Sequence, residues 1–302
     1  MIRRHSGLFF VEHTLSVPLN HADPQGPHIE IFAREVREAD PVAEGRPFLL
    51  YLQGGPGNRS PRGLPVWLRR ATRDYRVVLL DQRGTGLSTP LTRQTLARVA
   101  DPAAHLAHFR ADSIVADAEL LRAHLAGDRP WSVEAFFENE LSEVFLRRVD
   151  QAISFAEQPL FAVLHEAIYG QRAATGWAAH RVRDEFPAFD LDSGGPVRFT
   201  GEMIYPWLFE EDPALIPLAG AAGRLATKSD WTPLYDPERL ATNKVPVVAA
   251  IYFDDMYVDR DMSLATAAAI GTLRPWVTSE YAHNGLGREE RVLDRLLTML
   301  RD

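Results

Sequence analysis

The sequence contains no cysteine among its 302 residues. Disulfide bonds, thiolate metal sites and a cysteine nucleophile are therefore excluded, and a reducing compartment is permitted. No apolar run reaches the length of about 20 residues that a membrane-spanning helix needs. Near the N-terminus, Glu12 and His13 interrupt the apolar stretch before a signal-peptide core is complete. We therefore expect a soluble, cytoplasmic protein with no membrane partner.

Long runs of one charge are absent as well. The chain has 33 Lys and Arg against 41 Asp and Glu, a formal net charge of −8, and the basic residues do not cluster. Nucleic acid and acidic lipid attract proteins through basic patches, so neither is an expected partner. With 46% hydrophobic and 25% charged residues, the composition is that of a globular protein with a sizeable core.

The first half of the chain alternates strand and helix patterns. Continuous apolar runs over 47–52 and 75–81 each end in a cluster of turn residues. Such runs are typical of strands buried on both faces of a parallel sheet. The stretch 28–36 alternates like a half-buried strand, and 112–126 has helical spacing before a terminal glycine. This order predicts an α/β fold, a mostly parallel sheet covered by helices on both sides.

The middle of the chain has a different character. Residues 134–222 are aromatic and acidic, with apolar positions at helical spacing, which predicts an inserted helical cap. Strand patterns return near 245–255 and 275–285, and a closing helix is predicted over 289–300. We therefore predict three parts: a first part of the sheet core (1–133), the cap (134–222) and a second part of the core (223–302).

Residues that can carry chemistry follow the predicted strands. Gly54 and Gly55 come directly after an apolar run, where backbone N–H groups can approach a ligand closely. Asp254 and Asp255 end a later strand, and His283 follows the next one. Catalytic groups gather at the carboxyl ends of such strands, so an Asp that orients a His is a partial charge relay. Taken singly, each residue also fits an ordinary turn or a solvated loop.

Six stretches carry a resemblance to the prolyl aminopeptidases (proline iminopeptidases) of the α/β-hydrolase superfamily. They are LQGGPGNRSPR, YRVVLLDQRGTGLSTP, FRADSIVADAELLRAHL, GEMIYPWLFEEDPAL, VPVVAAIYFDDMYVD and EYAHNGL. The pairing of GGPG with DQRGTGLSTP is specific to that family. The resemblance implies an α/β-hydrolase-like, mostly parallel sheet flanked by helices, with an inserted helical cap. It also implies release of N-terminal proline, or of another small apolar residue, by a Ser-His-Asp mechanism that needs no cofactor and no metal.

The same resemblance assigns roles to particular residues. Asp255 corresponds to the triad acid, because it directly precedes MYV, and His283 corresponds to the general base. Gly54 and Gly55 correspond to the oxyanion loop. Glu202 resembles the cap carboxylate that receives the free α-amino group of the substrate, which makes a peptide with a free N-terminus the expected partner.

The nucleophile of this family is absent from the sequence. The family carries its serine in G-x-S-x-G, on a sharp turn after the central strand called the nucleophile elbow, and no such pentapeptide occurs here. It would follow the strand that ends at Val133, which instead runs directly into Glu134. Ser132 lies inside that strand, Ser193 follows no strand, and Ser88 belongs to a different turn. The family's next strand and early cap helices lack counterparts too, so the sheet is expected to be incomplete.

Three interpretations remain open. The natural protein is a catalytic family member and this chain lacks an internal segment; or a real deletion has left a noncatalytic binding or scaffold protein; or Asp81 is a covalent nucleophile in another class of enzyme. Removing a central strand leaves buried backbone N–H and C=O groups without hydrogen-bond partners. Each such group costs about 1 to 3 kcal/mol, whereas the total stability of a protein is roughly 5 to 15 kcal/mol. The first interpretation is therefore favoured. The preferred N-terminal residue, the natural substrates and the oligomeric state stay open.

Overall fold

The computed structural model describes residues 2–54, 58–136, 155, 159–183, 185–190, 195, 198, 200 and 203–301. Its strands are β1 (Ile2–His5), β2 (Leu8–Pro18), β3 (His28–Glu38), β4 (Phe48–Gln53), β5 (Arg76–Leu80), β6 (Ser132–Phe136), β7 (Val247–Tyr252) and β8 (Leu273–Thr278). Its α-helices are α1 (Val66–Ala71), α2 (Arg93–Leu96), α3 (Pro102–Leu106), α4 (Ala111–Ala126), α6 (Pro159–Leu164), α7 (Ala178–Arg183), α8 (Leu208–Glu211), α9 (Ala219–Thr227), α10 (Pro237–Ala241), α11 (Arg260–Ala269), α12 (Gly285–Arg288) and α13 (Glu290–Arg301). Short 3₁₀-helices are η1 (Pro41–Gly45), η2 (Ala167–Tyr169), η3 (Pro187–Phe189) and η5 (Ile216–Leu218).

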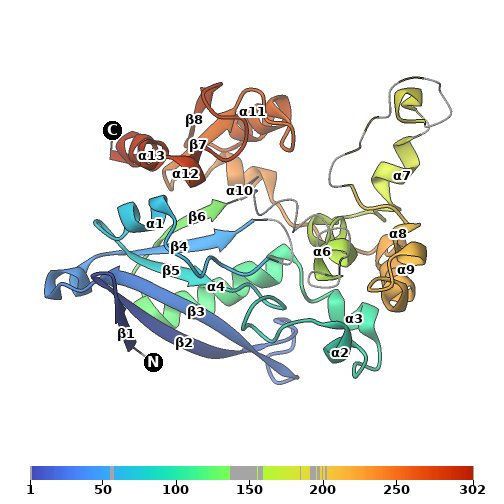
Figure 1. The fold of residues 1–302 in the computed structure, drawn as a ribbon, viewed down its shortest axis with the longest axis horizontal. Coiled ribbons are helices and arrows are strands. Elements are labelled where there is room, and N and C mark those ends of the chain that lie inside the picture. Colours follow the sequence, from blue (N-terminus) through green and yellow to red (C-terminus); the bar gives the residue numbers. More distant parts are fainter. Residues whose placement is uncertain are drawn as a thin grey trace.

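The strands form two sheets (Figure 1). The larger sheet has the order β1-β2-β3-β5-β4-β6, and β7 pairs with β8 in a separate sheet. The pairs β1–β2, β2–β3 and β3–β5 are antiparallel, whereas β4 runs parallel to β5 and β6, and β7 runs parallel to β8. The α/β fold class is confirmed. The larger sheet is mixed rather than mostly parallel, because the N-terminal strands β1 and β2, which no sequence pattern had indicated, extend it by antiparallel pairing.

Strands β4 and β5 are buried on both faces of the larger sheet. Leu50 and Val78 belong to one core cluster, which also contains residues of α4, α6 and α9. Leu49 and Tyr51 belong to a second cluster, which contains residues of α1, α12 and α13. The Tyr51 ring stacks on Trp67 of α1 with 4.5 Å between ring centroids. Because successive strand residues point to opposite faces, this burial explains the two continuous apolar runs in the sequence.

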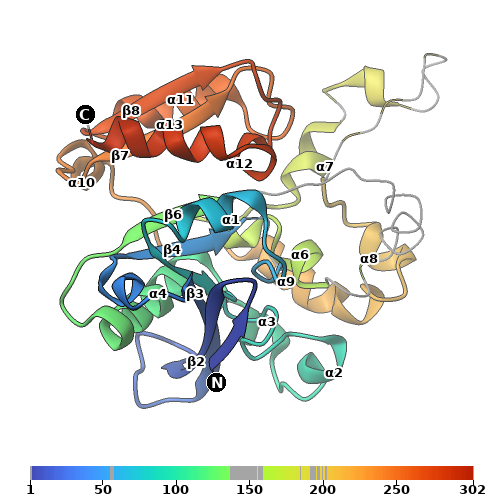
Figure 2. The same ribbon diagram turned by 60° about the vertical axis from the view of Figure 1, so that its left-hand side comes forward.

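Helices α6, α8 and α9, which lie between β6 and β7 in the chain, contribute residues to the first of these clusters. Helix α9 lies against α3 and α6, and both views place α6, α8 and α9 beyond the arrowhead of β4 (Figures 1 and 2). The expected part boundaries at 133 and 222 fall inside β6 and α9 respectively. The division into a core and an inserted cap stays a prediction.

Strand β6 continues three residues past the expected boundary at Val133. Its register pairs Val133 with Leu50 and ends with Phe136 opposite Gln53. The ladder with β4 is made by backbone groups, so an acidic residue at position 134 does not end it. The strand thus runs farther than its sequence pattern indicated.

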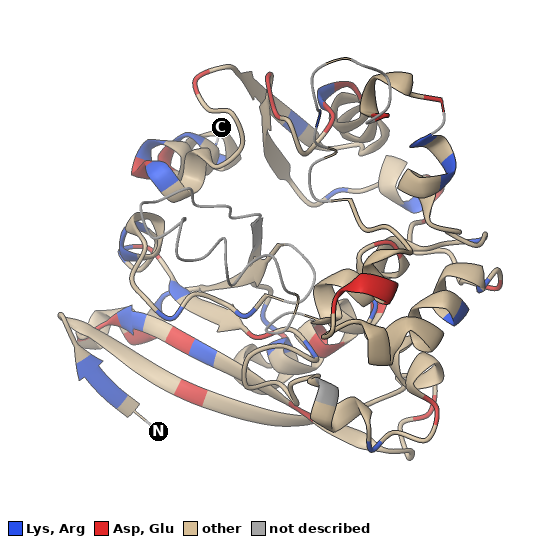
Figure 3. Cartoon of the chain, turned by 45° about the vertical axis from the view of Figure 1, so that its right-hand side comes forward, with Lys and Arg blue, Asp and Glu red and all other residues tan. Residues whose placement is uncertain are grey.

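Acidic and basic residues are interspersed over the described elements, as Figure 3 shows. One buried acidic residue, Glu35 on β3, has a carboxylate that is 2% exposed and is surrounded by basic side chains. Arg76 Nε donates to its Oε1 at 2.8 Å, and His13 Nε2 lies 3.3 Å from its Oε2. Arg37 Nε lies 3.4 Å from Oε1. Burial opposes ionisation of this carboxyl, but the hydrogen bonds from His13 and Arg76 outweigh it and lower the pKa of Glu35 from 4.5 to about 2.

Replacing Glu35 with Gln is expected to lower the free energy of unfolding by about 3 kcal/mol near pH 7, because the partly buried Arg37 and Arg76 lose their counter-ion. The folded-state pKa is the lower one, so the contribution of Glu35 is present above about pH 4.5 and is lost as the pH falls toward 2. Urea unfolding of the chain and of Glu35→Gln at several pH values measures both effects. Glu30→Gln, an exposed position on the same strand, is the control. Equal unfolding midpoints for the two variants would contradict this account.

Candidate active site

Asp255 lies in the turn that follows β7, and its carboxylate is held by the backbone. Oδ1 accepts the N–H groups of Tyr257 at 2.9 Å and Val258 at 3.0 Å. The side chain is 7% exposed. A carboxylate that accepts two backbone N–H groups has little freedom to rotate, so Asp255 presents its second oxygen in one direction.

His283 lies between β8 and α12 and faces that carboxylate. Its Nδ1 is 2.8 Å from Oδ2 and 2.9 Å from Oδ1 of Asp255. The imidazole ring also packs on the ring of Tyr257, with centroids 4.7 Å apart. Asn284, the next residue, caps α12 by accepting the Gly287 N–H at 2.9 Å. The histidine is therefore fixed by a hydrogen-bonded carboxylate, an aromatic ring and a capped helix.

This arrangement sets the proton positions on His283. A carboxylate can only accept, so Nδ1 carries the proton and donates it to Asp255, which leaves Nε2 with a free lone pair. An imidazole held in this way is a general base that can take a proton from a hydroxyl placed at Nε2. The structure brings Asp255 to His283, while the adjacent Asp254 is exposed.

Gly54 follows β4 in the larger sheet, directly after a residue held by side-chain hydrogen bonds. Gln53 Oε1 accepts the Tyr51 hydroxyl at 2.8 Å, and the Gln53 carbonyl accepts Gln82 Nε2 at 3.0 Å. Gly54 itself is half-buried. Gly55 and Glu202, the other two residues assigned by resemblance, lie outside the described residues.

The serines weighed as nucleophiles occupy other positions. Ser88 is fully buried, and its Oγ donates to the carbonyl of Asp81 at 2.5 Å and accepts the Phe32 N–H at 2.8 Å. Ser132 begins β6 opposite Leu49, at the amino end of the parallel strands. Ser193 lies outside the described residues. Ser88 is buried and hydrogen-bonded in the turn after β5, and Ser132 lies at the amino end of its strand, so neither is placed as a nucleophile.

Asp81 follows β5, and its carboxylate is fully occupied by structural hydrogen bonds. Oδ1 accepts the backbone N–H of Ser60 at 3.0 Å and the Ser60 hydroxyl at 2.7 Å. Oδ2 accepts Arg62 Nη2 and the Leu87 N–H, the latter at 2.9 Å. The residue is 0% exposed. Gly86, at φ +53°, is required beside it, because a Cβ there would lie 2.1 Å from Oδ2. This carboxylate holds two loops together and has no oxygen free to attack a substrate.

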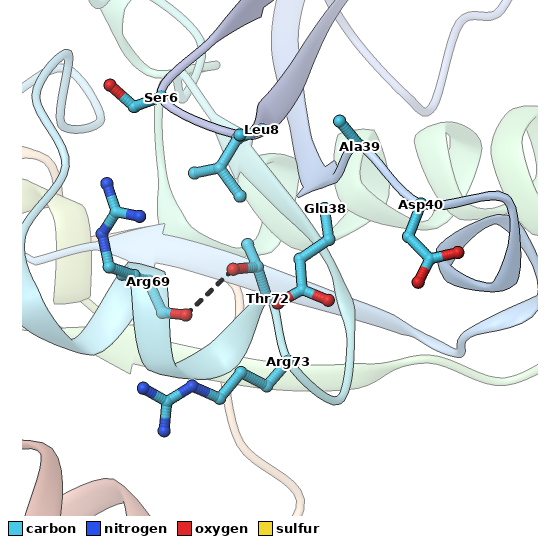
Figure 4. Close-up of a pocket in the computed structure, with 9 residues that line it drawn as sticks. Ser6, Leu8, Glu38, Ala39, Asp40, Arg69, Thr72 and Arg73 are labelled. Carbon is cyan, nitrogen blue, oxygen red and sulfur yellow. Dashed lines mark hydrogen bonds between the residues drawn. The ribbon is translucent and has the colours of Figure 1, made fainter.

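A cavity of about 380 Å³ lies away from the Asp255–His283 pair (Figure 4). Its lining residues come from the β1–β2 turn, the end of β3, the start of η1 and the C-terminal end of α1. They are Ser6, Gly7, Leu8, Glu38, Ala39, Asp40, Arg69, Thr72 and Arg73. Asp40 precedes β4 and Arg73 precedes β5, so the cavity lies at the amino ends of strands whose carboxyl ends lead to Gly54 and Asp81.

In the part of the chain that the structure describes, no group of three or more His, Asp or Glu side chains is arranged to hold a metal ion. Over the same residues, every helix is too short or too polar to cross a bilayer. That nucleic acid is not a partner and that the protein is cytoplasmic stay predictions.

Sequence reasoning missed the contribution of Tyr257. Its backbone N–H holds Asp255 and its ring covers one face of His283. The signal available in the sequence was an aromatic residue two positions after the strand-ending acid. That spacing places the residue in the same turn, but only the fold brings the histidine loop against its ring.

Comparison with known proteins gives two long matches. A proline iminopeptidase from Aeromonas sobria is 36% identical over 414 residues, covering 98% of this chain and 97% of the relative. A proline iminopeptidase from Aspergillus aculeatus is 28% identical over 401 residues, covering 91% of this chain and 90% of the relative. Since the chain has 302 residues, at least 112 of the 414 aligned positions have no residue of this chain opposite them. No protein-family model matches.

Solved structures give weaker likenesses over almost the whole chain. An esterase from Thermogutta terrifontis has a TM-score of 0.49 at 17% identity, covering 96% of this chain and 98% of that one. An esterase from a Rhodococcus species has a TM-score of 0.48 at 16% identity, covering 97% of this chain and 98% of that one.

Proposed function

Because the chain belongs to the proline iminopeptidase family, we propose that it holds the acid and base of a serine aminopeptidase site whose nucleophile lies on a segment outside these 302 residues. The observation that carries the proposal is the contact of His283 Nδ1 with the buried Asp255 carboxylate, at 2.8 Å. The sequence that contains this acid and base has no G-x-S-x-G motif. An oriented histidine base can activate a serine placed at its free ring nitrogen.

The absent segment belongs directly after β6. This strand ends at Phe136, at the same end as Gly54 and opposite Gln53, which is where an elbow after a central strand would turn. The separation of β7 and β8 into their own sheet supports the same position, because one strand between β6 and β7 would join the two sheets. The relative from Aeromonas sobria has at least 112 positions without a counterpart here, enough for an elbow, a strand and several helices.

The mechanism follows from the roles of these groups. The elbow serine Oγ forms a bond to the carbonyl carbon of the N-terminal residue, while its proton passes to His283 Nε2. The peptide C–N bond then breaks, and the leaving amine takes that proton from His283. Water, deprotonated by the same nitrogen, attacks the acyl ester, releases the amino acid and returns the proton to the serine. Asp255 holds the imidazole throughout, and the backbone at Gly55 helps to hold the oxyanion.

The substrate is a peptide with a free N-terminus. Glu202, by family resemblance, binds the α-amino group, and N-terminal proline or another small apolar residue occupies the adjoining pocket. The two long matches are both proline iminopeptidases, which supports this substrate class. The chemistry uses side chains and backbone groups alone, so we propose no cofactor and no metal.

Grafting tests the proposal. The segment of the Aeromonas sobria relative that aligns with no residue of this chain is inserted after β6, and hydrolysis of a proline anilide is measured. The grafted chain is expected to hydrolyse it, whereas the 302-residue chain is not. The matched control replaces the elbow serine of the graft with Ala. A grafted chain that folds cooperatively and shows no hydrolysis above this control would overturn the proposal.

A second candidate is a noncatalytic binding protein, and the absence of G-x-S-x-G is the observation that favours it. In that case the chain would still bind peptide N-termini, through the Glu202 carboxylate that the family resemblance assigns to this role. Calorimetric titration of the 302-residue chain with a short prolyl peptide and with its N-acetylated form separates the cases. Binding that requires the free amine, together with an inactive graft, would favour the second candidate.

A further inference from the structure

The cavity at the amino ends of β4 and β5 is separate from the candidate active site (Figure 4). Its volume of about 380 Å³ falls in the lower part of the range of small-molecule sites, about 300 to 1,000 Å³. Catalytic groups of α/β sheets gather at the carboxyl ends of the strands, where Gly54 and Asp81 lie. The cavity lies at the other end, and none of its lining residues belongs to the charge relay or the oxyanion loop.

Hydrogen bonds join the elements that form the walls of this cavity. The Ala39 N–H donates to the Gly7 carbonyl at 2.9 Å, which holds the β1–β2 turn against the segment after β3. Arg46 Nη1 donates to Glu38 Oε2 at 2.8 Å and to the Thr72 carbonyl at 2.6 Å, which connects the end of β3 with the end of α1. These bonds fix the three elements relative to one another, so the cavity has a defined shape.

Charges of opposite sign line two sides of the cavity. Arg69 on α1 and Arg73, which follows that helix, supply two guanidinium groups. Glu38 at the end of β3 and Asp40 just after it supply two carboxylates. Figure 4 shows the guanidinium groups on one side and the carboxylates on the other. The two positive and two negative charges cancel, so the lining favours neither a lone anion nor a lone cation.

The two guanidinium groups have donors to spare. Among the described residues, no carboxylate pairs with Arg69, which is exposed. Arg73 Nη1 approaches Glu290 Oε2 only to 3.9 Å, which is beyond hydrogen-bonding range. A guanidinium carries five N–H donors and can hold a carboxylate through two parallel bonds. Both arginines can therefore receive the carboxylate of a ligand.

The two carboxylates each have one oxygen already bonded. Glu38 Oε2 accepts Arg46 Nη1, and Asp40 Oδ1 accepts the Val42 N–H at 2.9 Å. The other oxygens, Oε1 of Glu38 and Oδ2 of Asp40, have no partner among the described residues. A carboxylate only accepts hydrogen bonds and an ammonium group only donates them, so these two oxygens suit the ammonium group of a ligand.

We propose that this cavity binds a small zwitterion, a free α-amino acid or a dipeptide. Its carboxylate lies against Arg69 and Arg73, and its ammonium group lies against Glu38 and Asp40. A ligand with one charge would bring that charge next to two groups of the same sign, whereas a zwitterion meets opposite charges at both ends. The inference goes beyond the proposed function and does not rest on it, because no residue of this site takes part in the mechanism.

Calorimetric titration of the 302-residue chain tests the inference with L-alanine and L-alanyl-L-alanine. N-acetyl-L-alanine lacks the ammonium group, L-alaninamide lacks the carboxylate, and inorganic phosphate is a plain anion. We expect saturable one-to-one binding of at least one zwitterion, and affinities at least tenfold weaker for the other three compounds. The tighter of the two zwitterions identifies the ligand as an amino acid or as a dipeptide.

Variants locate the bound zwitterion. Arg69→Gln and Arg73→Gln are each expected to weaken its binding about tenfold, because each removes charged hydrogen bonds. Asp40→Asn is expected to do the same while its amide oxygen still accepts the Val42 N–H. Arg98→Gln is the matched control, since Arg98 is exposed and does not line the cavity, and it should bind as the unchanged chain does. Circular dichroism verifies that each variant is folded.

Three results would overturn the inference. They are no saturable binding of either zwitterion, equal binding of a compound with one charge, and zwitterion binding that Arg69→Gln and Arg73→Gln leave unchanged. The last result would place the ligand elsewhere on the chain. None of these titrations measures hydrolysis, so a failed graft would leave the zwitterion site standing, and an absent zwitterion site would leave the proposed function standing.

Discussion

In a grafted chain that carries the elbow serine, His283→Ala is expected to lower kcat/KM for a proline anilide by about 10³-fold or more, because the serine loses the base that removes its proton. Asp255→Asn is expected to cost about 10²- to 10⁴-fold. An amide in place of the carboxylate can present N–H to Nδ1, which favours the tautomer with its proton on Nε2 and removes the lone pair that the reaction needs. Steady-state kinetics of the three purified proteins measure both losses.

Asp254→Asn is the matched control for this pair. Asp254 is adjacent in sequence and carries the same group, but it is exposed, while Asp255 contacts His283. Its replacement is expected to leave kcat/KM within about twofold of the value for the unsubstituted grafted chain, since Asp254→Asn removes no contact to His283. Equal losses in Asp254→Asn and Asp255→Asn, or an unchanged rate in His283→Ala, would contradict the assignment of acid and base.

Asp81→Asn is expected to destabilise the 302-residue chain by about 3 to 5 kcal/mol. The substitution removes the negative charge that pairs with Arg62, and it places an amide N–H group opposite N–H and O–H donors that the carboxylate accepted. The bonds at risk are those from Ser60, Arg62 and Leu87. Total stabilities of roughly 5 to 15 kcal/mol make this a large fraction. Urea unfolding followed by circular dichroism measures the change.

Asp128→Asn, an exposed position after α4, controls for the substitution itself and should unfold with the unchanged chain. The same pair of variants separates a structural Asp81 from a nucleophilic one. A nucleophile can be exchanged for its amide with little loss of stability, so an Asp81→Asn chain with an unchanged unfolding midpoint would return Asp81 to the list of candidate nucleophiles.

The sequence predicted the strands best where both faces of a strand are buried. The runs that became β4 and β5 are apolar throughout because each strand has neighbours on both edges and core clusters on both faces. The contact of Asp255 with His283 could likewise be predicted, since the two residues follow strands that run parallel. Parallel strands end on the same side of a sheet, which brings residues 28 positions apart within hydrogen-bonding distance.

Other features depend on contacts that no local pattern records. Strand β2 pairs with β3 and β1 pairs with β2, so the place of both N-terminal strands in the sheet depends on the register between β2 and β3. β6 extends past Val133 because β4 lies beside it. β7 differs from β4 and β5: its sequence is also a continuous apolar run, but the strand is half-buried, because among the described strands it has a neighbour on one edge only.

We propose that these 302 residues hold the acid and the base of a charge relay without its nucleophile. The most direct measurement is intact mass spectrometry of the chain after treatment with a fluorophosphonate probe, which reacts with activated serines. We predict a single species at 33.9 kDa, the mass of the unmodified chain. A probe adduct on one serine, formed by the unchanged chain and lost in His283→Ala, would show that the chain already contains its nucleophile and would contradict the account.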